Sequence, residues 1–139
     1  MANPIIKTFA ELSGENNLFW GTDLVNFNGV SNYNVSRIGN LVNHSQNIYC
    51  EDGYLGEKLN DEALIVESLY VVADASLFPI STGNVYNNLN LNLNAVTIPG
   101  TNNIVITLSE KGNSRKTKYE DFKNLKNLNL SFNLAYMAI

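Results

Sequence analysis

The residues of this chain best suited to chemistry are its only histidine and its only cysteine, His44 and Cys50. They lie six positions apart, and Glu51 and Asp52 follow directly. A thiol nucleophile with a histidine base and an orienting carboxylate would need these residue types. The spacing does not favour such a site, because six residues can fall along one strand or across a turn. We favour a polar surface histidine and a buried, inert cysteine, and predict no catalytic residue.

Metal and nucleotide sites are not indicated either. A zinc site needs three or four Cys, His or carboxylate ligands, more than one histidine and one cysteine supply. The acidic stretch 52–62 lacks the alternating Asp and Asn ligands of a calcium-binding loop, so we interpret it as a solvated loop. No glycine-rich phosphate loop is present. We expect no metal, no cofactor and no enzyme activity.

Aromatic rings and side-chain amides suit a different chemistry, that of sugar binding. The chain has seven tyrosines, one tryptophan and 24 asparagines. Aromatic faces stack on sugar rings, and amides hydrogen-bond to sugar hydroxyls. Trp20, within the segment 19–23, is therefore the candidate glycan platform. A single tryptophan is also a common core residue, so both interpretations stay open.

Charge is sparse and unevenly distributed. Charged residues make up 16% of the chain, against roughly 25% in ordinary globular proteins, and the net charge is −4. A candidate docking loop is formed by the basic residues Lys111, Arg115, Lys116, Lys118, Lys123 and Lys126. Such a loop can dock on an acidic patch of a neighbouring subunit, or only keep a hairpin solvated. Nucleic-acid binding is not expected, because the pI is about 4.8 and such domains tend to values above roughly 9.

Strict alternation of apolar and polar residues predicts the clearest strands. In the segment 128–136 every even position is large and apolar, and every odd position is Asn, Ser or Ala. The same period runs through 89–94, where Leu alternates with Asn, and continues into 95–98. The turn-forming sequence 99–103 then leads into the β-branched stretch 104–108, which completes a hairpin signature.

The other predicted strands are less regular. They are one long strand over 63–73 and short strands over 24–28, 33–38 and 48–50. The segment 118–126 is the best helix candidate. Since no long amphipathic helix and no linker appear, we predict one antiparallel β-sandwich over residues 1–139, jelly-roll-like and of about eight strands.

The alternating strands present uncharged outer faces. The segments 89–94 and 128–139 contain neither a charged residue nor a proline, whereas exposed sheet edges are normally guarded by Lys, Pro or bulges. We expect these strands to be central in a sheet or covered by another chain. Faces without charge also pack against a neighbour without burying an unpaired ion. The pattern favours a structural or assembly subunit.

Targeting signals are not apparent. The start, 1–7, lacks a basic region followed by a long apolar run, so we expect no signal peptide. The most apolar stretch, 63–80, is interrupted by Glu67 and Asp74, so we expect no membrane span. These features predict synthesis in a cytoplasm.

The chain resembles small β-sandwich structural proteins of bacteriophage particles, such as capsid vertex, decoration or minor virion proteins. The resemblance lies in the segments 88–94 and 125–139 and in the lack of a catalytic motif. It implies a jelly-roll or related sandwich, symmetric oligomers and a place in a virion assembled in the host cytoplasm. The implied partners are other copies and neighbouring structural proteins. A carbohydrate-binding or adhesin-type sandwich is the alternative.

Overall fold

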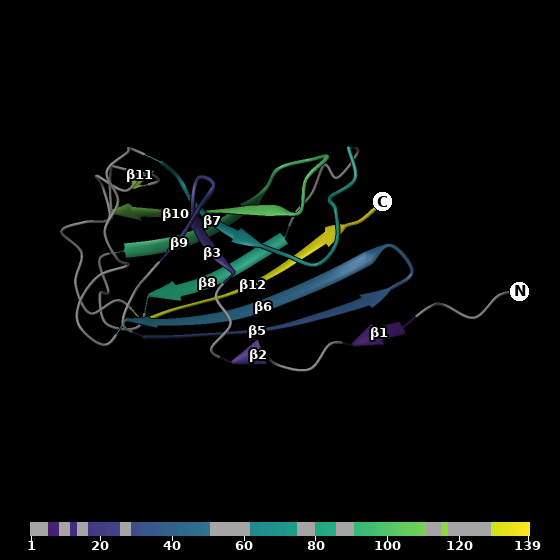
Figure 1. Ribbon diagram of the computed structural model, residues 1–139, viewed down its shortest axis with the longest axis horizontal. Coiled ribbons are helices and arrows are strands. Elements are labelled where there is room, and N and C mark those ends of the chain that lie inside the picture. Colours follow the sequence, from purple (N-terminus) through teal and green to yellow (C-terminus); the bar gives the residue numbers. More distant parts are fainter. Residues whose placement is uncertain are drawn as a thin grey trace, which may run out of the picture.

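The structure is a computed structural model of the chain. It describes residues 6–8, 12–13, 17–25, 29–50, 62–74, 80–85, 91–110, 115–116 and 129–139. Within these ranges every regular element is a strand and every strand pair is antiparallel. The predicted all-β antiparallel sandwich is confirmed (Figure 1).

The first sheet has the order β1–β5–β6–β12–β8, with β2 also paired to β5. Its strands are β1 (Ile6–Thr8), β2 (Leu12–Ser13), β5 (Gly29–Ile38), β6 (Leu41–Cys50), β8 (Ile80–Val85) and β12 (Asn129–Met137). The strand β12 lies between β6 and β8, so it is central in the sheet, which is one of the two positions expected for its uncharged sequence. Its even residues point into the core, and its odd residues point outward.

The second sheet has the order β11–β10–β7–β3–β4, with β9 also paired to β10. Its strands are β3 (Leu18–Trp20), β4 (Asp23–Leu24), β7 (Leu64–Glu67), β9 (Leu91–Thr97), β10 (Asn103–Glu110) and β11 (Arg115–Lys116). The predicted hairpin is confirmed, since β9 pairs with β10 from Leu91↔Glu110 to Thr97↔Ile104. These pairings alone do not assign the sandwich to the jelly-roll class.

Glycines permit the two tight hairpin turns. Gly39 has a φ of 58° between β5 and β6, and Gly100 has a φ of 80° between β9 and β10. A side chain would be strained at either position, because L-residues rarely adopt positive φ. The β5–β6 hairpin is much longer than the predicted strands 33–38 and 48–50, since both strands have ten residues. The predicted strand 24–28 is strand only at Leu24, and residues 26–28 lie outside the described ranges.

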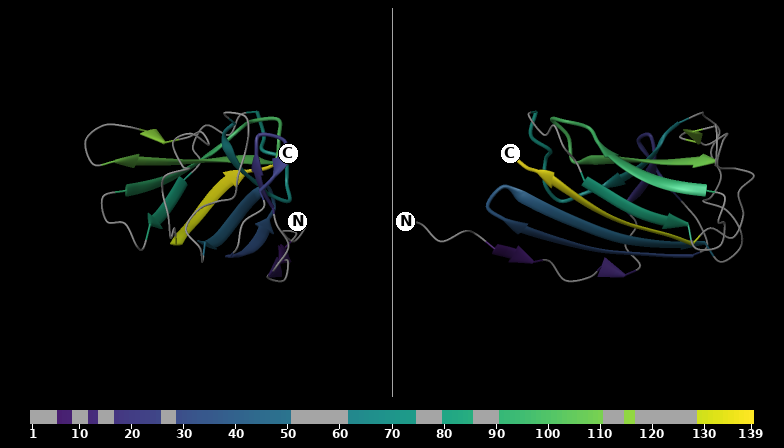
Figure 2. Two further views of the ribbon diagram at one scale, coloured as in Figure 1. Left: turned by 60° about the vertical axis from the view of Figure 1, so that its left-hand side comes forward. Right: turned by 180° about the vertical axis from the view of Figure 1, so that it is seen from behind.

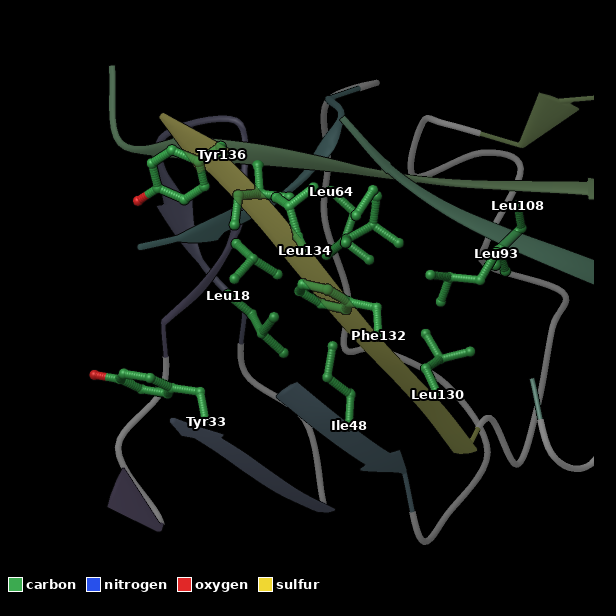
Figure 3. Packing of buried hydrophobic residues seen from close by; sticks show 14 of the residues in the cluster. Leu18, Tyr33, Ile48, Leu64, Leu93, Leu108, Leu130, Phe132, Leu134 and Tyr136 are labelled. Atoms are coloured by element: carbon green, nitrogen blue, oxygen red, sulfur yellow. The ribbon is translucent and has the colours of Figure 1, made fainter. Parts of the chain in front are cut away.

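The two sheets enclose one apolar core. Figure 3 shows leucines from both sheets meeting Phe132 and Ile48 between the layers. The largest fully buried side chains are Trp20, Tyr136, Leu18, Ile48, Leu64, Ile104, Ile106, Leu108 and Leu130. Burying an aliphatic or aromatic side chain contributes roughly 1.5–3 kcal/mol each, so this cluster is the main source of stability.

The predicted long strand over 63–73 is wrong beyond Glu67, where β7 ends. Ser68 is buried and bonds outside the β7 ladder: its N–H donates to Asn102 O at 2.8 Å, and its carbonyl accepts from Asn102 Nδ2 at 2.8 Å. The backbone then reaches the first sheet, where the Ala73 N–H donates to Met137 O at 2.9 Å. We call residues 68–73 the crossover segment, because it ties the end of one sheet to the other.

The sheets also meet along β8 and β9, which lie side by side (Figures 1 and 2). Gly83 of β8 makes this approach possible. An added Cβ there would overlap Leu93 Cδ2 and lie 3.2 Å from Leu93 Cβ and Cγ. Leu93 therefore fills the space that a side chain at position 83 would occupy.

Gly83→Ala is expected to lower the free energy of unfolding by about 1–3 kcal/mol, because the added methyl group overpacks the β8–β9 contact. Urea denaturation at pH 7 measures the change. Adding Leu93→Ala should relieve the overlap, so the double variant should lose less stability than the two single variants summed. Strict additivity would contradict this account of Gly83.

Candidate functional site

His44 and Cys50 do not form a catalytic pair. Both lie on β6, six residues apart, and a strand rises about 3.3 Å per residue, so their Cα atoms are about 20 Å apart. The predicted surface position of His44 is wrong, because its side chain is 0% exposed. It occupies an inward position of β6 between Val42 and Ile48, which are also buried. The predicted burial of the Cys50 side chain lies outside what the structure describes.

His44 is hydrogen-bonded at both ring nitrogens inside the core. Its Nδ1 lies 2.9 Å from Ser68 Oγ, and its Nε2 lies 2.8 Å from Gln46 Oε1. Ser68 Oγ is also 3.0 Å from the hydroxyl oxygen of Tyr136. That hydroxyl donates to the carbonyl oxygen of Tyr70 at 2.7 Å. The chain of bonds therefore connects β6 and β12 to the crossover segment.

Gln46 extends these bonds toward β3 and β5. Its Nε2 donates to Asn17 Oδ1 and to Ser31 Oγ, both at 2.7 Å. Asn17 Nδ2 donates to Gln46 Oε1 at 3.1 Å and to the carbonyl oxygen of Glu67 at 3.0 Å. We call the buried polar side chains of Asn17, Ser31, His44, Gln46, Ser68 and Tyr136 the His44 network.

Two aromatic rings enclose the imidazole. The centroids of Tyr33 and Phe132 each lie 5.7 Å from that of His44, with interplanar angles of 10° and 5°. Figure 3 shows Tyr33, Phe132 and Tyr136 of this region within the core. Burial lowers the pKa of His44 from 6.5 to about 4, although the hydrogen bond to Gln46 opposes the shift. His44 is therefore neutral at pH 7.

The hydrogen bonds assign the position of the His44 proton. The oxygen Oε1 of Gln46 only accepts, so Nε2 of His44 must carry the hydrogen. In the neutral ring Nδ1 is then an acceptor facing Ser68 Oγ. Because the ring is enclosed on all sides, the arrangement offers a substrate no access to His44. Its chemistry is confined to hydrogen bonding and proton uptake.

The sequence carries a weak signal for this network. The inward positions of β6 are Val42, His44, Gln46 and Ile48, which repeat every second residue. Of these four residues only Val42 and Ile48 are apolar. The alternation of a buried strand is therefore visible in the sequence only if His44 and Gln46 are counted as buried residues. Asn17, Ser31 and Ser68 give no local signal, because only the packed sheets bring them to β6.

Trp20 is not a glycan platform. Its side chain is 1% exposed and belongs to the apolar core. In β3, Leu18 and Trp20 point inward while Phe19 points outward, as strand alternation requires. The interpretation of Trp20 as a core residue is confirmed, and its interpretation as a glycan platform is wrong.

The predicted docking loop is only partly described. Arg115 and Lys116 form β11, which pairs with Ser109 and Leu108 of β10. The other basic residues, Lys111, Lys118, Lys123 and Lys126, lie outside the described ranges, as does the helix predicted over 118–126. A docking role for this loop stays a prediction.

The outer face of the first sheet bears no charge over its three long strands. Its described residues are Asn32, Asn34, Ser36 and Ile38 of β5, Leu41, Asn43, Ser45, Asn47 and Tyr49 of β6, and Asn129, Ser131, Asn133, Ala135 and Met137 of β12. Most are asparagine or serine, and Ser45 Oγ donates to Asn133 Oδ1 across the strands at 3.2 Å. We call these residues the amide face.

The part of the chain that the structure describes includes no helix long and apolar enough to span a bilayer. The same residues include no cluster of three or more His, Cys, Asp or Glu side chains placed to hold a metal ion.

No protein-family model, no curated protein and no solved structure matches this chain.

Proposed function

We propose that this chain is a structural subunit of a larger symmetric particle, and that the amide face is a contact between subunits. The observation that carries the proposal is the absence of charge from every described residue of that face. Roughly 25% of the residues of ordinary globular proteins are charged, whereas the centres of protein–protein interfaces are depleted in charge. Neutral amides can pair with a partner without leaving a buried ion.

One end of the amide face is apolar. Ile38 pairs with Leu41, and Leu41 pairs with Met137, so the three side chains form a row across β5, β6 and β12. They are 53%, 50% and 45% exposed. Large apolar side chains that gather on a surface mark interaction sites, and here they provide the hydrophobic part of the contact.

The second sheet offers another row on the opposite side of the sandwich. Its cross-strand neighbours are Val96, Val105, Ile65, Phe19 and Leu24, in that order. Leu24 and Val96, at the two ends, are 59% and 43% exposed. A subunit with contacts on both faces can join more than one neighbour, as a particle requires.

The resemblance to bacteriophage structural proteins supports a virion as the particle, formed after synthesis in a host cytoplasm. A carbohydrate-binding module is the second candidate, because Tyr49 is a 47% exposed aromatic residue on the same amide-rich face. A monomer that binds a glycan array, with binding lost in Tyr49→Ala, would favour the second candidate.

Asn133→Lys is expected to weaken self-association by at least about tenfold, because it places an unpaired charge at the centre of the amide face. The wild-type chain should show masses that are multiples of 15.4 kDa by light scattering, increasing with concentration. The matched control is Thr22→Lys, which adds the same charge at an exposed turn of the second sheet. Because Thr22 lies beside one end of the second row and not at the centre of a face, Thr22→Lys should weaken self-association less than Asn133→Lys does.

Two results would contradict the subunit contact. One is a wild-type chain that stays monomeric at every concentration. The other is an equal loss of association in Asn133→Lys and Thr22→Lys, which would reflect net charge and not the face.

A further inference from the structure

Four hydrogen bonds of the His44 network form a single row. They join Gln46 Oε1 to His44 Nε2, His44 Nδ1 to Ser68 Oγ, Ser68 Oγ to the Tyr136 hydroxyl, and that hydroxyl to Tyr70 O. Each bond needs one hydrogen between its two heavy atoms. Whether the row is complete therefore depends on how many protons its members supply.

A backbone carbonyl determines the direction of the first bond. Glu67 O can only accept, so the Nδ2 group of Asn17 must face it. The Oδ1 of Asn17 then faces Gln46 Nε2, which leaves Gln46 Oε1 facing His44. Gln46 therefore supplies no hydrogen to the row.

A second backbone carbonyl determines the direction of the last bond. Tyr70 O can only accept, so the hydroxyl hydrogen of Tyr136 is used there. With neutral His44 the row has three protons, one each on His44, Ser68 and Tyr136, for four bonds. His44 Nδ1 and the Tyr136 oxygen are therefore two acceptors that compete for the single hydroxyl hydrogen of Ser68. One more proton, on Nδ1, completes the row.

The surroundings oppose that extra proton. The described acidic residues, Asp23, Glu62, Glu67, Asp74 and Glu110, are all exposed, so none faces the ring. The described groups that face the network are Tyr33 and Arg37 of β5, Phe132 and Tyr136 of β12, Asn17 before β3, and Ser68 and Tyr70 of the crossover segment. Arg37, whose guanidinium lies 4.8 Å from the Tyr70 ring centroid, adds positive charge nearby. Imidazolium here is fully hydrogen-bonded, and the residues that the structure describes offer it no counter-ion.

We propose that His44 is a proton-operated switch for the crossover segment. When His44 gains a proton, Nδ1 becomes a donor to Ser68 Oγ, and Ser68 donates to Tyr136. The row is then complete, but no described acidic side chain balances the buried charge. Hydration of the ring would stabilise this charge. Ser68, which covers Nδ1, belongs to the crossover segment, so opening of that segment admits the water. The switch operates within one chain and does not depend on the proposed assembly.

The first test is an NMR titration of the His44 ring in the wild-type chain and in Tyr136→Phe. Without the Tyr136 hydroxyl, Ser68 donates to His44 Nδ1 without competition. The neutral form of the ring then has a stronger hydrogen bond and is stabilised relative to the protonated form. The pKa of His44 should fall by about half a unit or more. Ser45→Ala, on the opposite face of the same strand, should leave it unchanged. An equal or higher pKa in Tyr136→Phe would overturn the competition for the Ser68 proton.

The second test uses the wild-type chain and holds even if the variant does not fold. The ¹⁵N chemical shifts of the neutral His44 ring should show the proton on Nε2. A proton on Nδ1 would overturn the assignment. Hydrogen exchange should show that the amides of Val72 and Ala73, which donate to Thr101 O and Met137 O, lose protection between pH 7 and pH 4.5. The Ile106 amide of β10 should keep its protection over the same pH range. Unchanged protection in the crossover segment, or equal loss everywhere, would overturn the switch.

Discussion

Gln46→Leu should lower the free energy of unfolding by about 3–5 kcal/mol, the largest effect expected of any substitution named here. Leucine is close to glutamine in size but forms no hydrogen bond. The substitution removes the acceptor of His44 Nε2 and the donor to Asn17 Oδ1 and Ser31 Oγ, all in the core. Each buried polar group that loses its partner costs roughly 1–3 kcal/mol. Guanidinium denaturation at pH 7 measures the loss.

The control for Gln46→Leu is the next residue of the same strand. Asn47 is exposed on the amide face, and Asn47→Ala should change stability by no more than about 0.5 kcal/mol. A loss below about 1 kcal/mol in Gln46→Leu would show that the His44 network contributes little to stability.

Acidification should destabilise the fold by about 3 kcal/mol through His44 alone. Its pKa is about 4 in the folded chain against 6.5 for the unperturbed group. Between these values the unfolded chain binds a proton that the folded chain does not, so stability falls as the pH is lowered. The contribution is complete above about pH 7 and is lost progressively from pH 6.5 to pH 4. Each pKa unit corresponds to about 1.36 kcal/mol.

His44→Phe isolates this contribution. Phenylalanine keeps an aromatic ring between Tyr33 and Phe132 and cannot titrate. The quantity to compare is the pH dependence of the unfolding free energy of the variant, and not its stability at pH 7 alone. The difference in unfolding free energy between pH 7 and pH 4 should shrink by about 3 kcal/mol, because carboxylate contributions are common to both chains. Equal pH dependence in the two chains would place the acid sensitivity elsewhere.

Strands were predictable where the inward residues are apolar. In β9 and β12 leucines, Phe132 and Tyr136 alternate with small polar residues, so the local pattern alone identifies the strands and their buried faces. The hairpin from β9 to β10 follows from the turn signal between them. Local residue order determines these elements because side-chain direction alternates in any strand.

The pattern failed where polar residues point inward. His44 and Gln46 made the middle of β6 look like a surface segment, and the structure places them among the most buried residues. The apolar run over 63–73 looked continuous, yet β7 ends at Glu67. There the backbone leaves the ladder, and Ser68 bonds to Asn102, 34 residues away.

By itself the sequence determined the all-β class, the β9–β10 hairpin and the lack of charge along β12. Only the tertiary structure decided that Trp20 is buried, that Gly83 admits Leu93, and that Asn17, Gln46 and Ser68 surround one neutral histidine. The physical reason is range. Alternation is a property of neighbouring residues, whereas a buried polar side chain is stable only with partners that long-range packing supplies.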